Sequence, residues 1–193
     1  MAVVSAPGGD SPALLPHTIL GIDPGSMVTG WGVVTALGSS LTHVASGTIA
    51  AAGAQGQAAR LSRIYHGIRE VLNEFDLDGV SVEKVFFARN AQSALKLGQA
   101  RGVALLAAAE NGVAVHEYSS NEIKSAVVGY GHATKEQVQT MVGSLLRVSE
   151  KMAADAADAL AAAICHVHRQ TFYARMLEAV PDWRPGMRRR RLP

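Results

Sequence analysis

The stretch TILGIDPGSMVTGWGVVT, residues 18–35, decides how the fold begins. Its first six residues form a short apolar run that stops at Asp23, where a Pro-Gly pair indicates a turn. A second β segment, TGWGVVT (29–35), follows at once, and a third, LTHVASGTI (41–49), comes after a short polar joint. Three strands with such short connections predict an antiparallel meander.

Helices and strands alternate after the meander. From Leu61 to Phe75, apolar residues recur at helical spacing with charged residues on the opposite face, which predicts an amphipathic helix. Residues 80–87 have the composition of a fourth strand. Residues 93–110 form a helix that is apolar nearly all round, and residues 113–115 are expected to form a short fifth strand.

Two capping boxes predict where later helices begin. In this pattern a Ser or Thr is followed three residues later by Glu or Gln, and it occurs at Ser119 and at Thr134. The final helix is expected from about Ala154 to Leu177. The order of elements predicts an α/β fold with a five-stranded mixed sheet, antiparallel at its start and parallel in its additions, with helices on both faces.

Length and composition are consistent with one domain over residues 18–170. We expect residues 1–17, rich in Ala, Pro, Gly and Ser, to be a disordered lead, and residues 171–193 to hold the end of the last helix and a basic tail. The last 13 residues carry a charge of +4, which leaves −2 for residues 1–180. The body of the chain is therefore slightly acidic, and its overall charge gives no case for nucleic-acid binding.

The compartment predicted from the sequence is a reducing cytoplasm. Cys165 is the only cysteine and cannot form an internal disulfide. No apolar run approaches the roughly 18 residues of a membrane span, and the N-terminus lacks the basic start and apolar core of a signal peptide.

Four acidic residues are the candidate functional groups: Asp23, Glu83, Asp155 and Asp158. Each also has an ordinary interpretation. Asp23 is a common turn residue, Glu83 fits an edge strand with its side chain in water, and Asp155 fits the first turn of a helix. Asp155 and Asp158 are three apart in an otherwise apolar, alanine-rich helix, where like charges repel, so the pair costs stability and calls for an explanation.

Carboxylates from three separate elements favour hard divalent cations. Oxygen ligands suit Mg²⁺ or Mn²⁺, and four of them could hold two ions for phosphodiester hydrolysis. Cys165-His166-Val167-His168 looks at first like a zinc site. Residues i and i+2 point apart on a helix, however, so we expect a cysteine on one helix face and two surface histidines instead.

With these residues in place, the chain resembles the RuvC family of Holliday junction resolvases, in the RNase H-like superfamily. The resemblance covers about residues 18–168, in order, and four stretches carry it: GIDPGSMVTGWGVV (21–34), VEKVFFARNAQSALKLGQARGVALLAA (82–108), YSSNEIKSAVVGYGHATKEQVQTMV (118–142) and ADAADALAAAICH (154–166).

The resemblance implies a structure-selective endonuclease whose catalytic metal ligands are Asp23, Glu83, Asp155 and Asp158. It implies two ions of Mg²⁺ or Mn²⁺ in each subunit and four-way junction DNA as the substrate. It also implies a homodimer in which the 93–110 helix forms the contact surface between the two copies, and a branch-migration helicase complex of RuvA and RuvB type as partner. The residues that match positions expected on DNA are Phe86, Phe87, Arg89, Lys124 and Lys135.

Two other functions stay open at the level of sequence. GIDPGSMVTGWGVV also resembles the phosphate-loop hairpin of actin-like ATPases and sugar kinases, although those proteins pair two such domains and this chain has room for one. A noncatalytic module that binds branched DNA is the third hypothesis, and the intact set of four acids argues against it.

Overall fold

The computed structural model describes residues 15–84, 91–150 and 152–179. Within these ranges the chain forms five strands and five helices. In chain order they are β1 (His17–Asp23), β2 (Val28–Leu37), β3 (Ser40–Ala50), α1 (Gly56–Glu74), β4 (Gly79–Glu83), α2 (Ala91–Glu110), β5 (Val115–Tyr118), α3 (Ser120–Val128), α4 (Lys135–Leu146) and α5 (Ala154–Ala179).

The strands form one mixed sheet in the order β3-β2-β1-β4-β5. β1, β2 and β3 pair antiparallel, as the short joints between them predict, and β4 and β5 join β1 in parallel. In the β1–β2 pairing Asp23 lies opposite Gly30, and in the β4–β5 pairing Glu83 lies opposite Tyr118. The predicted α/β architecture is confirmed.

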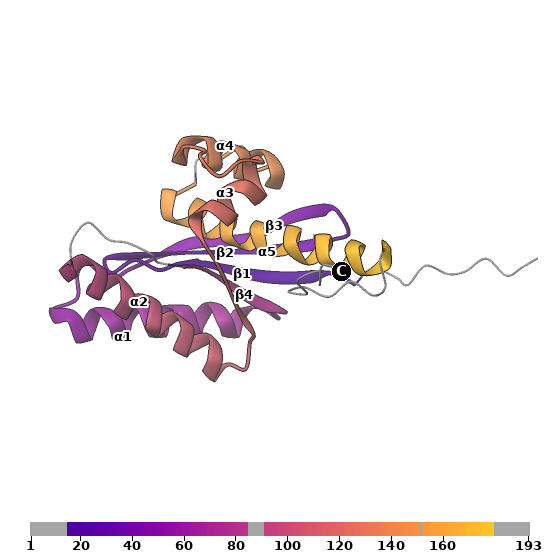
Figure 1. Ribbon diagram of the computed structural model, residues 1–193. Coiled ribbons are helices and arrows are strands. Elements are labelled where there is room, and N and C mark those ends of the chain that lie inside the picture. Colours follow the sequence, from indigo (N-terminus) through magenta and orange to yellow (C-terminus); the bar gives the residue numbers. More distant parts are fainter. Residues whose placement is uncertain (1–14, 85–90, 151, 180–193) are drawn as a thin grey trace, which may run out of the picture.

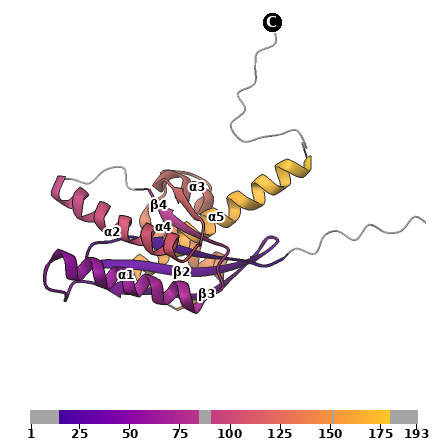
Figure 2. The ribbon, with the colours of Figure 1, turned by 90° about the horizontal axis from the view of Figure 1, so that it is seen from below.

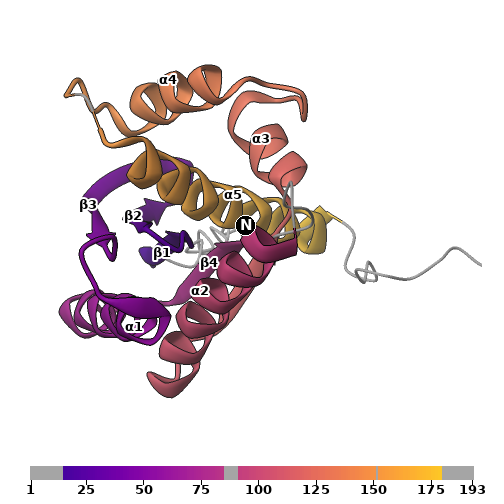
Figure 3. The same cartoon turned by 90° about the vertical axis from the view of Figure 1, so that its left-hand side faces the viewer.

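Helices cover both faces of the sheet, as Figure 1 shows with the sheet seen edge-on. α1 and α2 pack on one face, over a core that includes Leu20, Val33, Ile64 and Val80. α5 packs on the other face against β1 and β2, and α3 and α4 lie on the outer side of α5 (Figure 3). α5 is therefore enclosed between the sheet and two further helices, which is why a long alanine-rich helix is stable there.

The backbone of α5 approaches β1 and β2 unusually closely because two strand residues are glycines. A Cβ atom at Gly21 would lie 1.8 Å from the carbonyl oxygen of Ala159, and one at Gly30 would lie 1.9 Å from that of Asp155. No side chain fits in such a gap, so only glycine permits the contact. On β4, the buried Ser81 hydroxyl donates a hydrogen bond of 2.6 Å to the carbonyl oxygen of Ala162.

Both predicted capping boxes are present. Ser119 and Glu122 close the start of α3, and Thr134 and Gln137 close the start of α4, each through reciprocal side-chain and backbone hydrogen bonds. α3 then ends at Gly129, whose left-handed backbone conformation suits a glycine. These caps fix where the two outer helices begin.

The two parallel strands differ from the sequence prediction at their ends. β5 covers Val115–Tyr118 instead of 113–115, because the Val113 amide still bonds to the Ala108 carbonyl in the turn that ends α2. β4 ends at Glu83, so its predicted extension through Lys84 is wrong, and the rest of the predicted strand, 85–87, lies outside the described residues. The pairing with β5 ends at Glu83, so the ladder goes no further.

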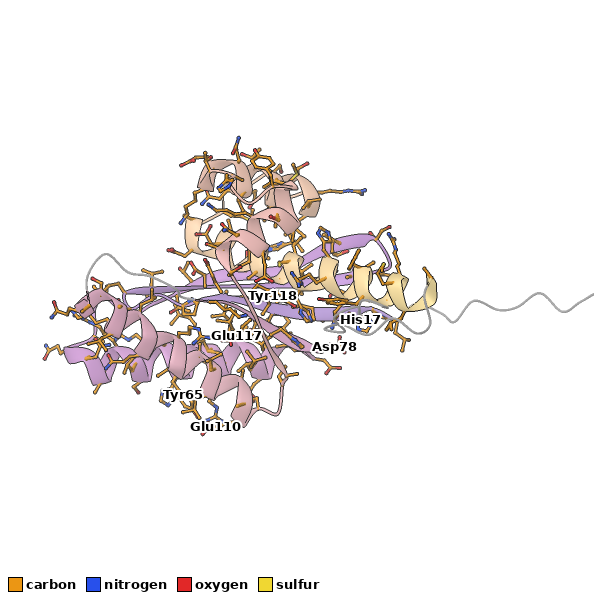
Figure 4. The ribbon with its side chains drawn as sticks, in the orientation of Figure 1. His17, Tyr65, Asp78, Glu110, Glu117 and Tyr118 are labelled. Carbon is orange, nitrogen blue, oxygen red and sulfur yellow. The ribbon has the colours of Figure 1, made fainter. Side chains whose placement is uncertain are left out.

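Polar contacts tie the α1–α2 layer together and to the sheet. Tyr65 of α1 donates a hydrogen bond to Glu110 of α2, and Figure 4 shows the two side chains side by side below the sheet. Glu117 and Tyr118, neighbours on β5, point to opposite faces: Glu117 pairs with Arg101 of α2, and Tyr118 contacts His166 of α5. Seen from below in Figure 2, α1 and α2 lie on the near side of the sheet, and the end of α5 extends beyond it.

None of the helices in the described ranges is long and apolar enough to cross a membrane. The predicted domain boundaries at residues 17 and 170 remain predictions.

Replacing Gly30 with alanine is expected to destabilise the fold by about 1–3 kcal/mol, because the new methyl group must push the first turn of α5 away from β2. Urea unfolding measures the loss. Gly53→Ala is the matched control, since a Cβ there meets only the tip of Arg63 at an ordinary 3.5 Å. Equal stability of the two variants would contradict the close approach of α5.

Candidate metal centre

Asp23 is the last residue of β1, at the carboxyl end of the central strand. The Gly30 residue opposite it contacts the backbone of Asp155, the acid in the first turn of α5. Asp158 follows one turn later on the same helix face. All three side chains are half-buried. The sheet register and the close approach of α5 therefore determine where the three carboxylates meet.

These three aspartates form a group with the geometry of a metal site. Each offers a carboxylate oxygen, and the three oxygens lie within 4.8 Å of one another. Among the described residues this is the one such group of three or more Asp, Glu, His or Cys side chains. The donors are all oxygen atoms, a set that fits Mg²⁺ or Mn²⁺ and not a thiolate-bound zinc.

Glu83, the fourth predicted ligand, lies beside this group but is not within the same 4.8 Å cluster. It ends β4, the strand next to β1, and its carboxylate accepts a hydrogen bond from the Ser120 hydroxyl at the start of α3. Its charge still acts on Asp23, where it contributes to the raised pKa of that carboxyl. The structure thus brings three of the four acids together and places the fourth as their neighbour.

Of the two lysines predicted on DNA, the structure brings one to the acids. Lys135, the first residue of α4, places its ammonium 2.5 Å from the Asp158 carboxylate, and this contact raises the pKa of Lys135. Lys124 lies half-buried in α3 and makes no ion pair with any described residue. The predicted DNA contacts Phe86, Phe87 and Arg89 lie outside the described residues.

Burial and the crowding of negative charge together set the electrostatics of the site. Burial raises the pKa of Asp23 to about 7, and repulsion from Asp158, Glu83 and Asp155 adds to the effect, while Lys135 opposes it. A single ammonium group does not balance four acids. The residues present therefore fit a dication, which would compensate the excess negative charge that, together with burial, favours a proton on Asp23.

The Cys165–His168 segment is no metal site within the described part of the chain, but one detail of its prediction is wrong. His166 is buried, not on the surface: its Nδ1 lies 2.7 Å from the Tyr118 hydroxyl, and its ring packs against that of His116. Burial lowers the pKa of His166 to about 4 and raises that of Cys165 to about 12. Helical spacing showed that the side chains diverge but not which of them faces β5.

Sequence reasoning missed two residues that shape the site, Ser120 and Gly30. Ser120 is 37 positions from its partner Glu83, and nothing local marks the contact. Gly30 did carry a signal, since a glycine inside a strand often marks close approach of another backbone. That signal did not identify α5 as the neighbour.

A mixed sheet with acids at the end of its central strand and in the first turns of the helix packed on it defines a metal-dependent nuclease of the RNase H-like class. The comparisons with known proteins agree. The chain belongs to the RuvC family: the family model, crossover junction endodeoxyribonuclease RuvC, matches residues 19–166.

Individual relatives cover most of the chain. The RuvC protein of Geobacter sulfurreducens is 53% identical over 150 residues, which span 78% of this chain and 92% of that protein. The RuvC protein of Pelobacter propionicus is 49% identical over 170 residues, spanning 86% and 97%. These matches favour the nuclease hypothesis over the actin-like and kinase hypothesis.

Solved structures show the same architecture. Thermus thermophilus RuvC in complex with Holliday junction substrate has a TM-score of 0.75 and 38% identity, covering 83% of this chain and 96% of that one. The yeast mitochondrial Holliday junction resolvase Ydc2 has a TM-score of 0.60 at 12% identity, covering 88% and 87%, which shows a shared fold.

The raised pKa of Asp23 predicts how metal-free stability depends on pH. The folded state holds the Asp23 proton up to about pH 7, whereas the unfolded chain releases it near 3.8, so this stabilising contribution is present in acid and is lost as the pH rises through that window. Asp23→Asn removes the dependence. Above pH 7, with EDTA present, the variant should be the more stable protein, by up to about 4 kcal/mol.

Urea unfolding of both proteins from pH 4.5 to pH 8 measures this difference. It should shrink toward pH 4.5, and saturating Mn²⁺ should restore the wild type at pH 8. A variant that is less stable than the wild type across the whole range would contradict the raised pKa of Asp23 that burial and the neighbouring acids produce.

Proposed function

We propose that this protein resolves Holliday junctions by cutting two DNA strands symmetrically in recombination and repair, with divalent metal ions held by Asp23, Glu83, Asp155 and Asp158. One observation carries the proposal: in a chain of the RuvC family, the carboxylates of β1 and α5 gather within 4.8 Å at the end of the central strand. If the substrate is chromosomal DNA, as this proposal requires, the enzyme would act in the cytoplasm, at the bacterial nucleoid.

The four acids would hold two ions, Mg²⁺ or Mn²⁺, in each subunit. Bound there, the ions supply an activated water and stabilise the charge that develops on the leaving 3′ oxygen. The chain's own part is to fix the ligands: β1 and β4 hold Asp23 and Glu83 at the carboxyl ends of two adjacent parallel strands, and α5 holds the other two acids one turn apart. Because the acids are half-buried, the charge of bound ions is screened less than at an open surface.

Lys135 and Lys124 would bind the DNA backbone near the cut. Lys135 lies against Asp158, so its ammonium is already at the centre and would move from carboxylate to phosphate when DNA and metal bind. The predicted stacking of Phe86 on a base near the crossover, with Phe87 and Arg89 beside it, belongs to the same proposal. Base–aromatic stacking contributes about 1–3 kcal/mol, and unpaired bases at a junction are available for it.

A homodimer would give the symmetric pair of cuts, and α2 offers a surface for it. Leu95, Gly98, Gly102 and Leu106 follow one another at helical spacing along its outer side. Leu95 is 68% exposed and Leu106 is 52% exposed, and a Cβ at either glycine would meet no described atom within 4 Å. An apolar stripe with two open glycines suits the close packing of a second copy. A branch-migration complex of RuvA and RuvB type would deliver the junction.

The cleavage prediction concerns a mobile four-way junction. With Mg²⁺ or Mn²⁺, the wild type should nick opposite strands at symmetric positions, whereas Asp23→Asn should bind the junction and cut it roughly a hundred- to a thousand-fold more slowly. This range corresponds to the several kcal/mol that a metal site contributes to the transition state. Denaturing gels measure the cleavage rates, and gel mobility shifts measure the affinity of each protein for the junction. Equal nicking by both proteins would refute the carboxylate assignment, and binding without metal-dependent cutting by the wild type would favour a noncatalytic module.

Gly102 lies in the middle of the proposed dimer surface on α2. Gly102→Glu places a charge on the stripe without a clash inside the chain, so the variant should sediment as a monomer of 20.2 kDa while the wild type sediments at about 40 kDa. Ser125→Glu, which adds the same charge to an exposed position on α3, should stay dimeric. A dimeric Gly102→Glu protein, or a monomeric wild type, would rule out α2 as the dimer surface.

A further inference from the structure

Ser120 is the described residue whose side chain holds the carboxylate of Glu83. Its hydroxyl donates a hydrogen bond to Oε1 of Glu83. A glutamate at a strand end has several free torsions, and holding it in one geometry costs side-chain entropy. The hydrogen bond from the Ser120 hydroxyl reduces the range of side-chain conformations that Glu83 samples. It engages Oε1 and leaves Oε2 available to bind a metal ion.

The backbone fixes the distance between the two residues. Glu83 and Tyr118 are partners in the β4–β5 ladder, and the Lys84 amide donates a hydrogen bond of 2.7 Å to the Tyr118 carbonyl, so the two strands are still joined where β4 ends. Ser120 comes two residues after Tyr118, as the first residue of α3. The pairing of β4 with β5 therefore places Ser120 close to Glu83.

The start of α3 is itself held firmly. Ser119 caps the helix through both its side chain and its backbone, in reciprocal contact with Glu122. Glu122 is in turn paired with Arg169 of α5 at 2.9 Å. The donor on Ser120 thus rests on a capped helix end that is tied to the same helix that carries Asp155 and Asp158.

We propose that Ser120 is a positioning residue of the metal centre: it holds Glu83 beside Asp23 with one carboxylate oxygen free for the ion. This inference rests on the proposed function, because it takes Glu83 as a ligand. Residues that hydrogen-bond to metal ligands commonly change metal affinity by 10- to 100-fold when they are lost. Ser120→Ala should therefore weaken Mn²⁺ binding although Ser120 itself does not touch the ion.

Calorimetric titration of the full-length protein with Mn²⁺ alone, without DNA, tests this proposal. Ser120→Ala should bind Mn²⁺ roughly ten-fold more weakly than the wild type, and Ser120→Thr, which keeps a hydroxyl, should restore most of the affinity. Ser125→Ala is the matched control, because it removes an exposed hydroxyl from the same helix and should bind like the wild type. Alanine is favourable in a helix, so thermal melting should show both variants folded.

The double variant separates this inference from the function it rests on. Ser120→Ala in a Glu83→Gln background should cause no further loss, because the serine acts through the glutamate. If Glu83→Gln weakens Mn²⁺ binding but Ser120→Ala does not, the positioning role alone is wrong. If Glu83→Gln binds like the wild type, Glu83 is no ligand, and both the ligand assignment and the role of Ser120 fail. Additive losses in the double variant would also overturn the proposal.

Discussion

The close contact between the backbone of α5 and the glycines of β1 and β2 determines the rest of this structure. At Gly21 and Gly30 the helix lies where any side chain would collide with it, so α5 sits directly on the sheet. Small residues on α5 make the same approach possible from the other side. Because Gly30 is also the ladder partner of Asp23, the contact that packs the helix is the one that brings Asp155 to Asp23. The same contact thus packs the core and brings the acids of the site together.

The clustered acids of this site destabilise the folded protein when no metal is bound. Three aspartates meet with Glu83 beside them, and Lys135 is the cation paired with them among the described residues. Burial, and then repulsion between these acids, raises the pKa of Asp23 to about 7. The first turn of α5, where the helix dipole favours anions, offsets part of the cost for Asp155. Such a cluster is useful only if a cation completes it. The same repulsion that weakens the metal-free protein should strengthen its affinity for a dication.

Much of the fold followed from local patterns, and the parts that did not follow depended on contacts between distant residues. The meander, the two capping boxes and the span of α5 were correct because turn residues, caps and helical spacing act within a few positions. The predicted end of β4 and the predicted start of β5 were wrong, because the length of each strand depends on which residues of the neighbouring strand pair with it. Burial of His166 and the bond from Ser120 to Glu83 depend on how β5 and α3 lie against the rest of the chain. The acids and Lys135 could be named from the sequence, but the contacts of Ser120 and Gly30 with the site could not.

The central claim is that these acids form one metal centre, and a crystal soaked with Mn²⁺ tests it most directly. An anomalous difference map should show peaks bound by Asp23, Asp155 and Asp158, with Glu83 completing the ligand set beside them. Two peaks about 3.5–4 Å apart would match a two-ion centre. A map with no peak at these carboxylates, or with Mn²⁺ bound only elsewhere on the protein, would contradict the account.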